Sequence, residues 1–301
     1  MSFNLVTILG PTAVGKTNLA AKIAHRFNGE IISADSRQVY KGMNLGTGKD
    51  YDDYNVDNTK IAYHLIDILE PNIDYSVYDF QNNFFKSFDQ INKKNKLPIL
   101  CGGTNLYIHS ILKKYELSDV SFNSAEFKTL LNHDFDQLKN ILVSESKSLH
   151  NKTDLTDKER IAKAILVNRS NKEIPNYPKI NSLNICIDAP RELIKTRITN
   201  RLKERLSKGL IDEVKNLIDS GKVDYNRLSY FGLEYKYIGL FLEEELSYND
   251  MFQKLNSAIH NFAKKQSTWL RKIEREGIKL YRIKENYFEE SVKIIEENFA
   301  K

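Results

Sequence analysis

The chain has 301 residues, of which 41% are hydrophobic and 28% are charged, with a net charge of +5 and a pI near 8.8. This composition is that of an ordinary globular protein and excludes a disordered, collagenous or disulfide-stapled chain. No apolar stretch reaches membrane-spanning length and the N-terminus lacks a signal-type apolar region. We therefore expect a cytoplasmic protein that does not bind membranes.

The first element in the chain is an apolar strand, Leu5–Leu9. It is followed by Gly10-Pro11-Thr12-Ala13-Val14-Gly15-Lys16-Thr17 and by a helical pattern that begins near Asn18. A strand, a glycine-rich loop and a helix in this order are typical of a phosphate-binding loop (P-loop). The glycines allow backbone N–H groups to face a phosphate, Lys16 reaches phosphate oxygens and the Thr17 hydroxyl suits Mg²⁺. The motif predicts a phosphate site without identifying the ligand that carries the phosphate.

The second predicted strand, Glu30–Ala34, leads directly into four polar residues, Asp35, Ser36, Arg37 and Gln38. The carboxyl ends of strands in an open α/β sheet are where ligands bind, so these side chains are expected beside the P-loop. Asp35 has three interpretations: a Mg²⁺ ligand through water, a general base, or a structural turn residue. The neighbouring polar residues favour a role in substrate recognition.

The middle of the chain contains a long polar loop over 41–63, a helix over Val77–Asn92 that starts after Ser76, and a strand, Pro98–Cys101. Gly102-Gly103-Thr104 then precede a helix over Asn105–Lys114, so a second glycine turn meets a helix start. Thr104 either caps that helix or binds a ligand, and the two are compatible. Cys101 and Cys186 are the only cysteines and lie in apolar runs, which predicts buried thiols rather than a disulfide or metal site.

A polar, helical segment from 116 to 178 lacks the apolar strands on either side and is expected to be an insertion domain. The core domain then comprises 1–115 and 179–301. A capping box, Thr156-x-x-Glu159, predicts a helix with Arg160 and Lys163 on one face. These two cations are either a solvated surface or a binding surface.

The chain returns to the core with a strand at Leu183–Asp188, where Asp188 is either a metal-associated acid or a helix cap. A helix after Pro190 bears Arg197, Arg201 and Arg205 four residues apart, as a cationic stripe. Helices are then predicted at 213–220, 233–244 and 248–275, followed by a strand at 278–283 and a final helix. The apolar stripe of the 248–275 helix is predicted to comprise Ile259, Phe262, Ala263, Trp269 and Ile273. The predicted fold is α/β: a parallel, P-loop NTPase-like sheet flanked by helices, with a small helical insertion domain.

Six segments resemble, in order, the signatures of the tRNA dimethylallyltransferases, also called tRNA isopentenyltransferases. They are the P-loop, 30–43, Gly46-Thr47, 64–67, 98–104 and 263–271. The resemblance implies transfer of a dimethylallyl group from dimethylallyl diphosphate to N6 of adenosine 37 in tRNA. It also implies Mg²⁺ as cofactor and the tRNA anticodon stem-loop as partner. We expect the protein to be a monomer.

The resemblance also implies roles for individual residues. Asp35 and Thr104 would be catalytic, with Asp35 accepting a proton from the adenine amine. The diphosphate would bind Gly10, Pro11, Thr12, Ala13, Val14, Gly15, Lys16, Thr17, Arg197 and Arg201, with Thr17 on the metal ion. The tRNA would contact Asp35, Ser36, Arg37, Gln38, Thr104, Arg160 and Lys163.

Two segments depart from the family pattern. Lys163-Ala-Ile-Leu-Val167 replaces Arg-Ala-Leu-Glu-Val, and Phe231-Gly-Leu-Glu-Tyr235 replaces Ile-Gly-Tyr-Lys-Glu. Lysine keeps the charge of arginine without its bidentate geometry, and we hypothesise an altered tRNA preference. Two alternative functions remain open: a nucleotide-kinase-like phosphotransferase, and a tRNA-binding module without catalysis.

Overall fold

The computed structural model describes residues 3–117, 120, 124–145, 157–169 and 176–299, and the chain divides into two compact units. Unit 1 comprises Met1–Lys114 and Pro178–Lys301, and unit 2 comprises Tyr115–Tyr177. Each unit has its own cluster of buried apolar side chains. Among the described residues, no helix is long and apolar enough to cross a membrane.

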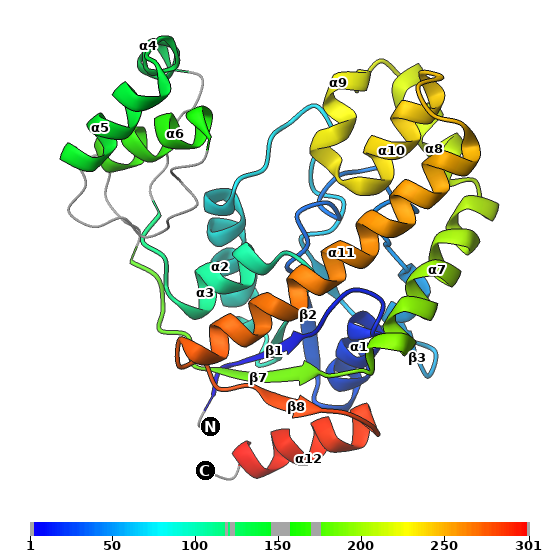
Figure 1. The fold of residues 1–301 in the computed structure, drawn as a ribbon. Coiled ribbons are helices and arrows are strands. Elements are labelled where there is room, and N and C mark those ends of the chain that lie inside the picture. Colours follow the sequence, from blue (N-terminus) through cyan, green and yellow to red (C-terminus); the bar gives the residue numbers. More distant parts are fainter. Residues whose placement is uncertain (1–2, 118–119, 121–123, 146–156, 170–175, 300–301) are drawn as a thin grey trace. The chain divides into compact units, whose positions relative to one another are not determined.

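Unit 1 is built on a six-stranded sheet with the order β5-β2-β6-β1-β7-β8, in which every pair of neighbouring strands is parallel (Figure 1). Its strands are β1 (Leu5–Leu9), β2 (Gly29–Ser33), β5 (Tyr63–His64), β6 (Leu97–Cys101), β7 (Ser182–Ile187) and β8 (Tyr281–Ile283). All residues of β1, β2 and β6 are buried. Because both faces of a parallel sheet are covered, such strands read as continuous apolar runs.

Helices flank this sheet, which confirms the predicted α/β class. They are α1 (Lys16–Arg26), α2 (Val77–Lys93), α3 (Asn105–Leu112), α7 (Arg191–Ser207), α8 (Leu210–Asp219), α9 (Tyr225–Leu228), α10 (Leu233–Leu242), α11 (Tyr248–Arg275) and α12 (Tyr287–Phe299). In α2, Phe80, Phe84 and Phe88 are buried in the core, and Ser76 with Asp79 forms a capping box that starts the helix.

Several predicted boundaries shift. Helix α1 begins at Lys16, before Asn18, because Gly15 adopts the left-handed conformation (φ 89°) and already acts as the N-cap. The last strand is confined to Tyr281–Ile283. The long loop contains a 3-10 helix (Tyr51–Tyr54) and a small hairpin of β3 (Asn55–Val56) and β4 (Thr59–Lys60).

The predicted apolar stripe of α11 is partly wrong. Ile259, Ala263 and Ile273 are buried and Trp269 is partly buried against the core, but Phe262 is 44% exposed. Leu270, which was not part of the prediction, is also buried. Gln266 occupies the buried face instead, because it follows Ala263 by three residues and precedes Leu270 by four. A polar side chain on this apolar face requires hydrogen-bond partners.

Unit 2 consists of α4 (Ala125–Asn132), α5 (Phe135–Glu145) and α6 (Lys158–Arg169). Phe127, Leu130, Leu138, Leu142 and Ile161 belong to its buried core. Thr156 of the predicted capping box lies outside the described residues. The Asp157 carboxylate accepts the backbone N–H of Arg160 at 3.0 Å and so caps α6.

The carboxyl ends of β2 and β6 are in direct backbone contact, which a glycine permits. A Cβ atom on Gly102 would lie 2.3 Å from both the carbonyl carbon and oxygen of Ala34. Neither backbone can retreat easily, because Ala34 N donates to Cys101 O at 2.8 Å and Thr104 N donates to Ala34 O at 3.0 Å.

We therefore expect Gly102→Ala to lower the free energy of unfolding by about 1–3 kcal/mol, the usual penalty of overpacking. Urea denaturation measures this loss. Gly103→Ala is the matched control, because its Cβ would meet only side-chain atoms, the nearest at 3.3 Å. Equal stability of the Gly102→Ala and wild-type proteins would contradict the steric argument.

Candidate functional site

Three loops leave adjacent strands at the same edge of the sheet: residues 10–17 after β1, 34–38 after β2 and 102–104 after β6. The strand order places β6 between β2 and β1, so the loop carrying Thr104 lies between the other two. Because parallel strands direct their carboxyl ends to one side, the residues predicted from separate motifs meet here.

The P-loop has the tight conformation that its glycines suggested. Ala13 (φ 64°) and Gly15 (φ 89°) are in the left-handed region, and Gly10 has φ 149°. A Cβ on Gly10 would lie 3.0 Å from Val14 Cγ2 and 3.1 Å from Ile187 O, so little space remains for a side chain. Lys16 Nζ donates a hydrogen bond to Pro11 O at 2.7 Å, which folds the lysine over its own loop.

The Lys16 ammonium is held in a low-dielectric environment. Its pKa is lowered from 10.5 to about 8, mainly by burial and in part by the nearby Arg201, while Cys101 and Asp35 act in the opposite direction. Burial and the neighbouring Arg205 likewise lower the pKa of Arg201 to about 10. A bound anion would relieve this mutual repulsion, so the site is electrostatically suited to a phosphate group.

Asp35 lies at the centre of the three loops. Its Oδ1 accepts the backbone N–H of Arg37 at 3.0 Å, an interaction typical of a turn. Its Oδ2 borders Gly103, since a Cβ on that glycine would be 3.3 Å away. One carboxylate oxygen therefore shapes the turn, and the other faces the loop after β6.

Thr104 is the N-cap residue of α3 but makes no side-chain cap hydrogen bond. Its hydroxyl oxygen instead accepts the Ser36 N–H at 2.9 Å and donates to Ser36 Oγ at 3.1 Å. The capping interpretation is therefore wrong for the side chain. These bonds connect the loop after β6 to the loop after β2.

Gln266 of α11 connects the remaining pair of loops. Its Oε1 accepts the Thr12 N–H at 2.8 Å and its Nε2 donates to Gly103 O at 3.0 Å. The side chain is buried, with 2% of the residue exposed. Sequence reasoning missed this residue, although a polar residue within an apolar helix face was the available signal.

The cationic stripe of α7 divides into two parts. Arg201 Nη2 donates to Thr12 Oγ1 at 2.6 Å, and Arg197 and Arg201 both line a pocket beside the P-loop. Arg205 is 7% exposed and does not line that pocket. It packs against Gly48 and lies 3.7 Å from Asp50, so the prediction of one continuous stripe is wrong.

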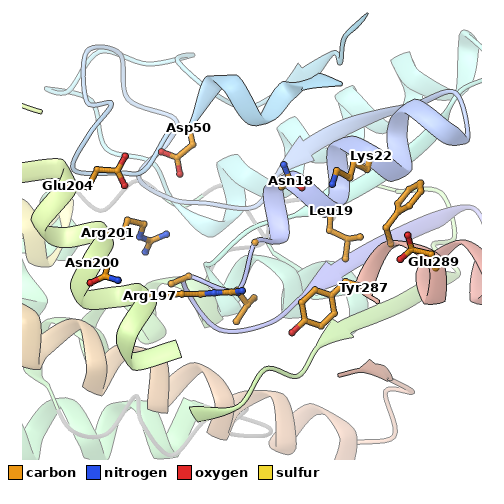
Figure 2. Close-up of a pocket in the computed structure, with 14 residues that line it drawn as sticks. Asn18, Leu19, Lys22, Asp50, Arg197, Asn200, Arg201, Glu204, Tyr287 and Glu289 are labelled. Atoms are coloured by element: carbon orange, nitrogen blue, oxygen red, sulfur yellow. The ribbon is translucent and has the colours of Figure 1, made fainter. Parts of the chain in front are cut away.

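The pocket has a volume of about 690 Å³. Figure 2 shows its walls: Arg197 and Arg201 of α7 on one side, Asn18 and Lys22 of α1 on the other, and Tyr287 of α12 below them. Residues 13–15 of the P-loop and the acidic residues Asp50, Glu204 and Glu289 also line it. The lining therefore contains as many carboxylates as cations, and the start of α1, where the helix dipole favours an anion, lies against it.

The Gln38 side chain holds the long loop of 41–63 in place. Its Nε2 donates to Gly48 O at 3.0 Å, and its Oε1 accepts from Ser33 Oγ at 3.1 Å. The Glu213 carboxylate of α8 secures the same loop by accepting the N–H groups of Asn44, Leu45 and Gly46 at 2.8, 2.7 and 3.0 Å. Glu213 is a second residue that sequence reasoning missed, and no local pattern identified it.

In unit 2, Arg160 is exposed on α6, and Lys163 forms an ion pair with Glu159 one turn earlier. Both are on the surface of this small unit, and the pair is of the usual i, i+4 type. Their part in binding stays a prediction.

Among the described residues, no three or more His, Cys, Asp or Glu side chains are grouped as a metal site. Asp188 is 3.5 Å from Arg282, and the N-cap of α7 is Pro190, so Asp188 does not cap that helix. Cys101 and Cys186 are free buried thiols, as predicted, and burial raises the pKa of each to about 12.

Comparison with known proteins agrees with this architecture. The model of the family described as IPP transferase matches residues 38–273. The chain is 49% identical over 284 residues to tRNA dimethylallyltransferase 1 of Azobacteroides pseudotrichonymphae, covering 93% of this chain and 92% of that protein. It is 47% identical over 283 residues to tRNA dimethylallyltransferase 2 of Phocaeicola vulgatus, with coverages of 93% and 92%.

A solved structure, the tRNA isopentenylpyrophosphate transferase of Bacillus halodurans, superposes with a TM-score of 0.69 at 28% identity. The match covers 99% of this chain and 95% of that one. Sequence and structural similarity therefore extend over nearly the entire chain. The chain belongs to the IPP transferase family.

Proposed function

We propose that this protein transfers the dimethylallyl group of dimethylallyl diphosphate to N6 of adenosine 37 in tRNA. The products are the N6-(dimethylallyl)adenosine-containing tRNA and diphosphate. The single observation that carries the proposal is the Gln266 bridge between Thr12 of the P-loop and Gly103, with Asp35 bordering the same glycine. The bridge holds the proposed phosphate-binding loop next to Gly103, which borders the carboxylate that we propose as the base.

The diphosphate is proposed to bind the loop Gly10–Thr17 together with Lys16, Arg197 and Arg201. Support comes from the lowered pKa values of Lys16 and Arg201, which arise mainly from burial and in part from neighbouring cations, Arg201 for Lys16 and Arg205 for Arg201. As the allylic C–O bond breaks, its electron pair leaves with the diphosphate. The cations stabilise the negative charge that accumulates on that leaving group.

Mg²⁺ is the proposed cofactor. Thr17 stands at the start of α1 beside the P-loop, and a hydroxyl plus phosphate and water oxygens is a donor set that suits Mg²⁺. Bound there, Mg²⁺ would supply further charge stabilisation to the leaving diphosphate.

On the acceptor side, N6 of adenosine 37 attacks the carbon that the diphosphate leaves. Asp35 is the proposed base that takes the N6 proton, and its proximity to Gly103 supports this role. Thr104 and Ser36, joined by two hydrogen bonds, are proposed to bind the reacting nucleotide, which must leave its stack to enter the site.

The remaining tRNA contacts are proposed to come from Arg37, Gln38, Arg160 and Lys163. Gln38 would act mainly through the long loop that it holds, since its amide already bonds to Gly48 O. Unit 2 is proposed to be the tRNA-binding insertion domain. We propose a monomer that works in the cytoplasm, where tRNA is available.

A direct assay tests the proposed function. The protein is incubated with unmodified tRNA, dimethylallyl diphosphate and Mg²⁺, and the digested RNA is analysed by mass spectrometry. We expect N6-(dimethylallyl)adenosine, and none from a control tRNA with guanosine at position 37. A folded protein that yields no product, or that instead uses ATP to phosphorylate small acceptors, would refute the proposal.

Replacement of Asp35 by Asn separates chemistry from binding. The amide keeps an oxygen for the Arg37 N–H but cannot accept the proton, so kcat should fall by about 10²–10⁴-fold. The tRNA dissociation constant, measured by filter binding, should stay within about twofold of wild type because the turn that residue 35 shapes is kept. An unchanged kcat would eliminate Asp35 as the base.

The Lys16 pKa of about 8 in the free protein predicts proton uptake on diphosphate binding. Above pH 8 the amine is largely neutral, and the bound anion favours its charged form, so the pKa rises and a proton is taken up. Affinity for diphosphate should therefore fall as pH rises from 7.5 to 9.5.

Calorimetric titration with inorganic diphosphate at pH 8.5, in buffers of different ionisation enthalpy, measures this uptake. Lys16→Arg is the control, because arginine stays charged throughout this range. The ligand's own protons contribute equally to both proteins, so the difference reports Lys16. Equal proton uptake by the two proteins would show that Lys16 is already charged at pH 8.5.

A further inference from the structure

We propose that Tyr230 is a positioning residue that holds the Arg37 guanidinium in place for the tRNA nucleotide beside the reacting adenosine. Tyr230 lies in a 3-10 helix, Ser229–Phe231, between α9 and α10. It contributes no group to the phosphate pocket or to the bonds around Asp35. The inference rests on the proposed function, since it assumes that Arg37 contacts tRNA.

Arg37 has a fixed backbone and an open side chain. Its N–H donates to Asp35 Oδ1, which ties its position to the candidate base. Its guanidinium carbon lies 4.9 Å from the centroid of the Tyr230 ring, within the range of a cation–π interaction. Within the described part of the chain, no carboxylate pairs with this guanidinium, so its hydrogen-bond donors are available to a ligand.

The Tyr230 ring is itself held firmly. Its hydroxyl accepts the Tyr75 N–H at 3.1 Å and shares a hydrogen bond of 3.1 Å with the hydroxyl of Tyr40, which is fully buried. The Phe231 ring contacts it edge-on at 5.4 Å. A ring fixed at both its edge and its hydroxyl is a rigid platform.

Arg227 provides an internal comparison on the same ring. Its guanidinium carbon is also 4.9 Å from the Tyr230 centroid, but its Nε donates to Pro71 O at 2.8 Å and its Nη2 is 2.9 Å from Asp74 Oδ1. Arg227 thus has partners within the protein that hold the platform together. Arg37 has only the ring face, which orients it while leaving its donors unused.

This arrangement has a clear physical benefit for binding. A flexible arginine loses side-chain entropy when it binds RNA, and a stacked guanidinium has lost part of that freedom already. Stacking also leaves the planar N–H fork free to bind a phosphate or a base edge in a defined direction. The ring should therefore act on tRNA affinity and not on binding of the diphosphate donor.

Steady-state kinetics of two variants test the inference in the full-length protein. Tyr230→Leu removes the π face and should raise KM for tRNA about two- to fivefold, in line with the strength of a cation–π contact. Tyr230→Phe keeps the π face but loses the hydrogen bonds of the hydroxyl with Tyr75 and Tyr40, so its KM for tRNA should rise less than that of Tyr230→Leu. KM for dimethylallyl diphosphate should be unchanged in both.

The decisive comparison repeats Tyr230→Leu in an Arg37→Ala background. If the ring acts through Arg37, the second substitution produces no further rise in KM for tRNA. An equal rise in both backgrounds would overturn the inference. If Arg37→Ala alone leaves KM for tRNA unchanged while dimethylallyl transfer proceeds, Arg37 does not grip tRNA and the inference fails although the proposed function survives.

A variant that keeps the aromatic ring separates the effect of the π face from a loss of folding. Incorporation of 3,4,5-trifluorophenylalanine at position 230 weakens the π face while keeping the ring, so KM for tRNA should exceed that of Tyr230→Phe. Thermal melting confirms that both proteins fold equally well. Identical KM values for these two variants would show that the ring only fills space.

Discussion

The buried amide of Gln266 is the interaction on which the geometry of the site depends. Its two halves bond to two different loops, Thr12 of the P-loop and Gly103 after β6. An amide is suited to this position because it offers an acceptor and a donor at once, whereas an apolar residue would leave both backbone groups without partners. The long helix α11 is thereby fastened to the edge of the sheet where the loops meet.

The second feature of the site is a cluster of cationic side chains that is buried beside apolar strands. Burial lowers the pKa of both Lys16 and Arg201, with Arg201 adding to the effect on Lys16 and Arg205 to the effect on Arg201, and Lys16 lies near the buried thiol of Cys101 at the end of β6. Such a cluster is costly without an anion and becomes favourable when one binds. Asp35 contributes a single negative charge at the boundary of this cluster, where it influences Lys16 without neutralising it.

The long loop of 41–63 is fixed by polar contacts in addition to the buried side chains of Met43, Tyr54 and Ile61. The carboxylate of Glu213 accepts hydrogen bonds from three successive N–H groups, and the Tyr235 hydroxyl donates to the same carboxylate at 2.7 Å. Close contacts at Gly46 with Tyr235 and at Gly48 with Arg205 leave no room for a Cβ. A segment whose regular structure is limited to a 3-10 helix, a short hairpin and the first residue of β5 is thus given one conformation, and it brings Asp50 to the pocket beside the P-loop.

Much of the fold and of the site could be predicted from the sequence, because it depends on local patterns of residues. Continuous apolar runs marked β1, β2, β6 and β7 because strands of a parallel sheet are buried on both faces, and the P-loop and Asp35–Gln38 followed those strands directly. The resemblance of the motifs indicated the family. The rest was decided by contacts between residues far apart in the chain: Thr12 with Gln266, 254 positions away, Thr12 with Arg201, 189 away, and Arg37 with Tyr230. Sequence periodicity places a side chain on a face of its own helix, but its partner depends on how whole helices pack against the sheet, and only the tertiary structure contains that information.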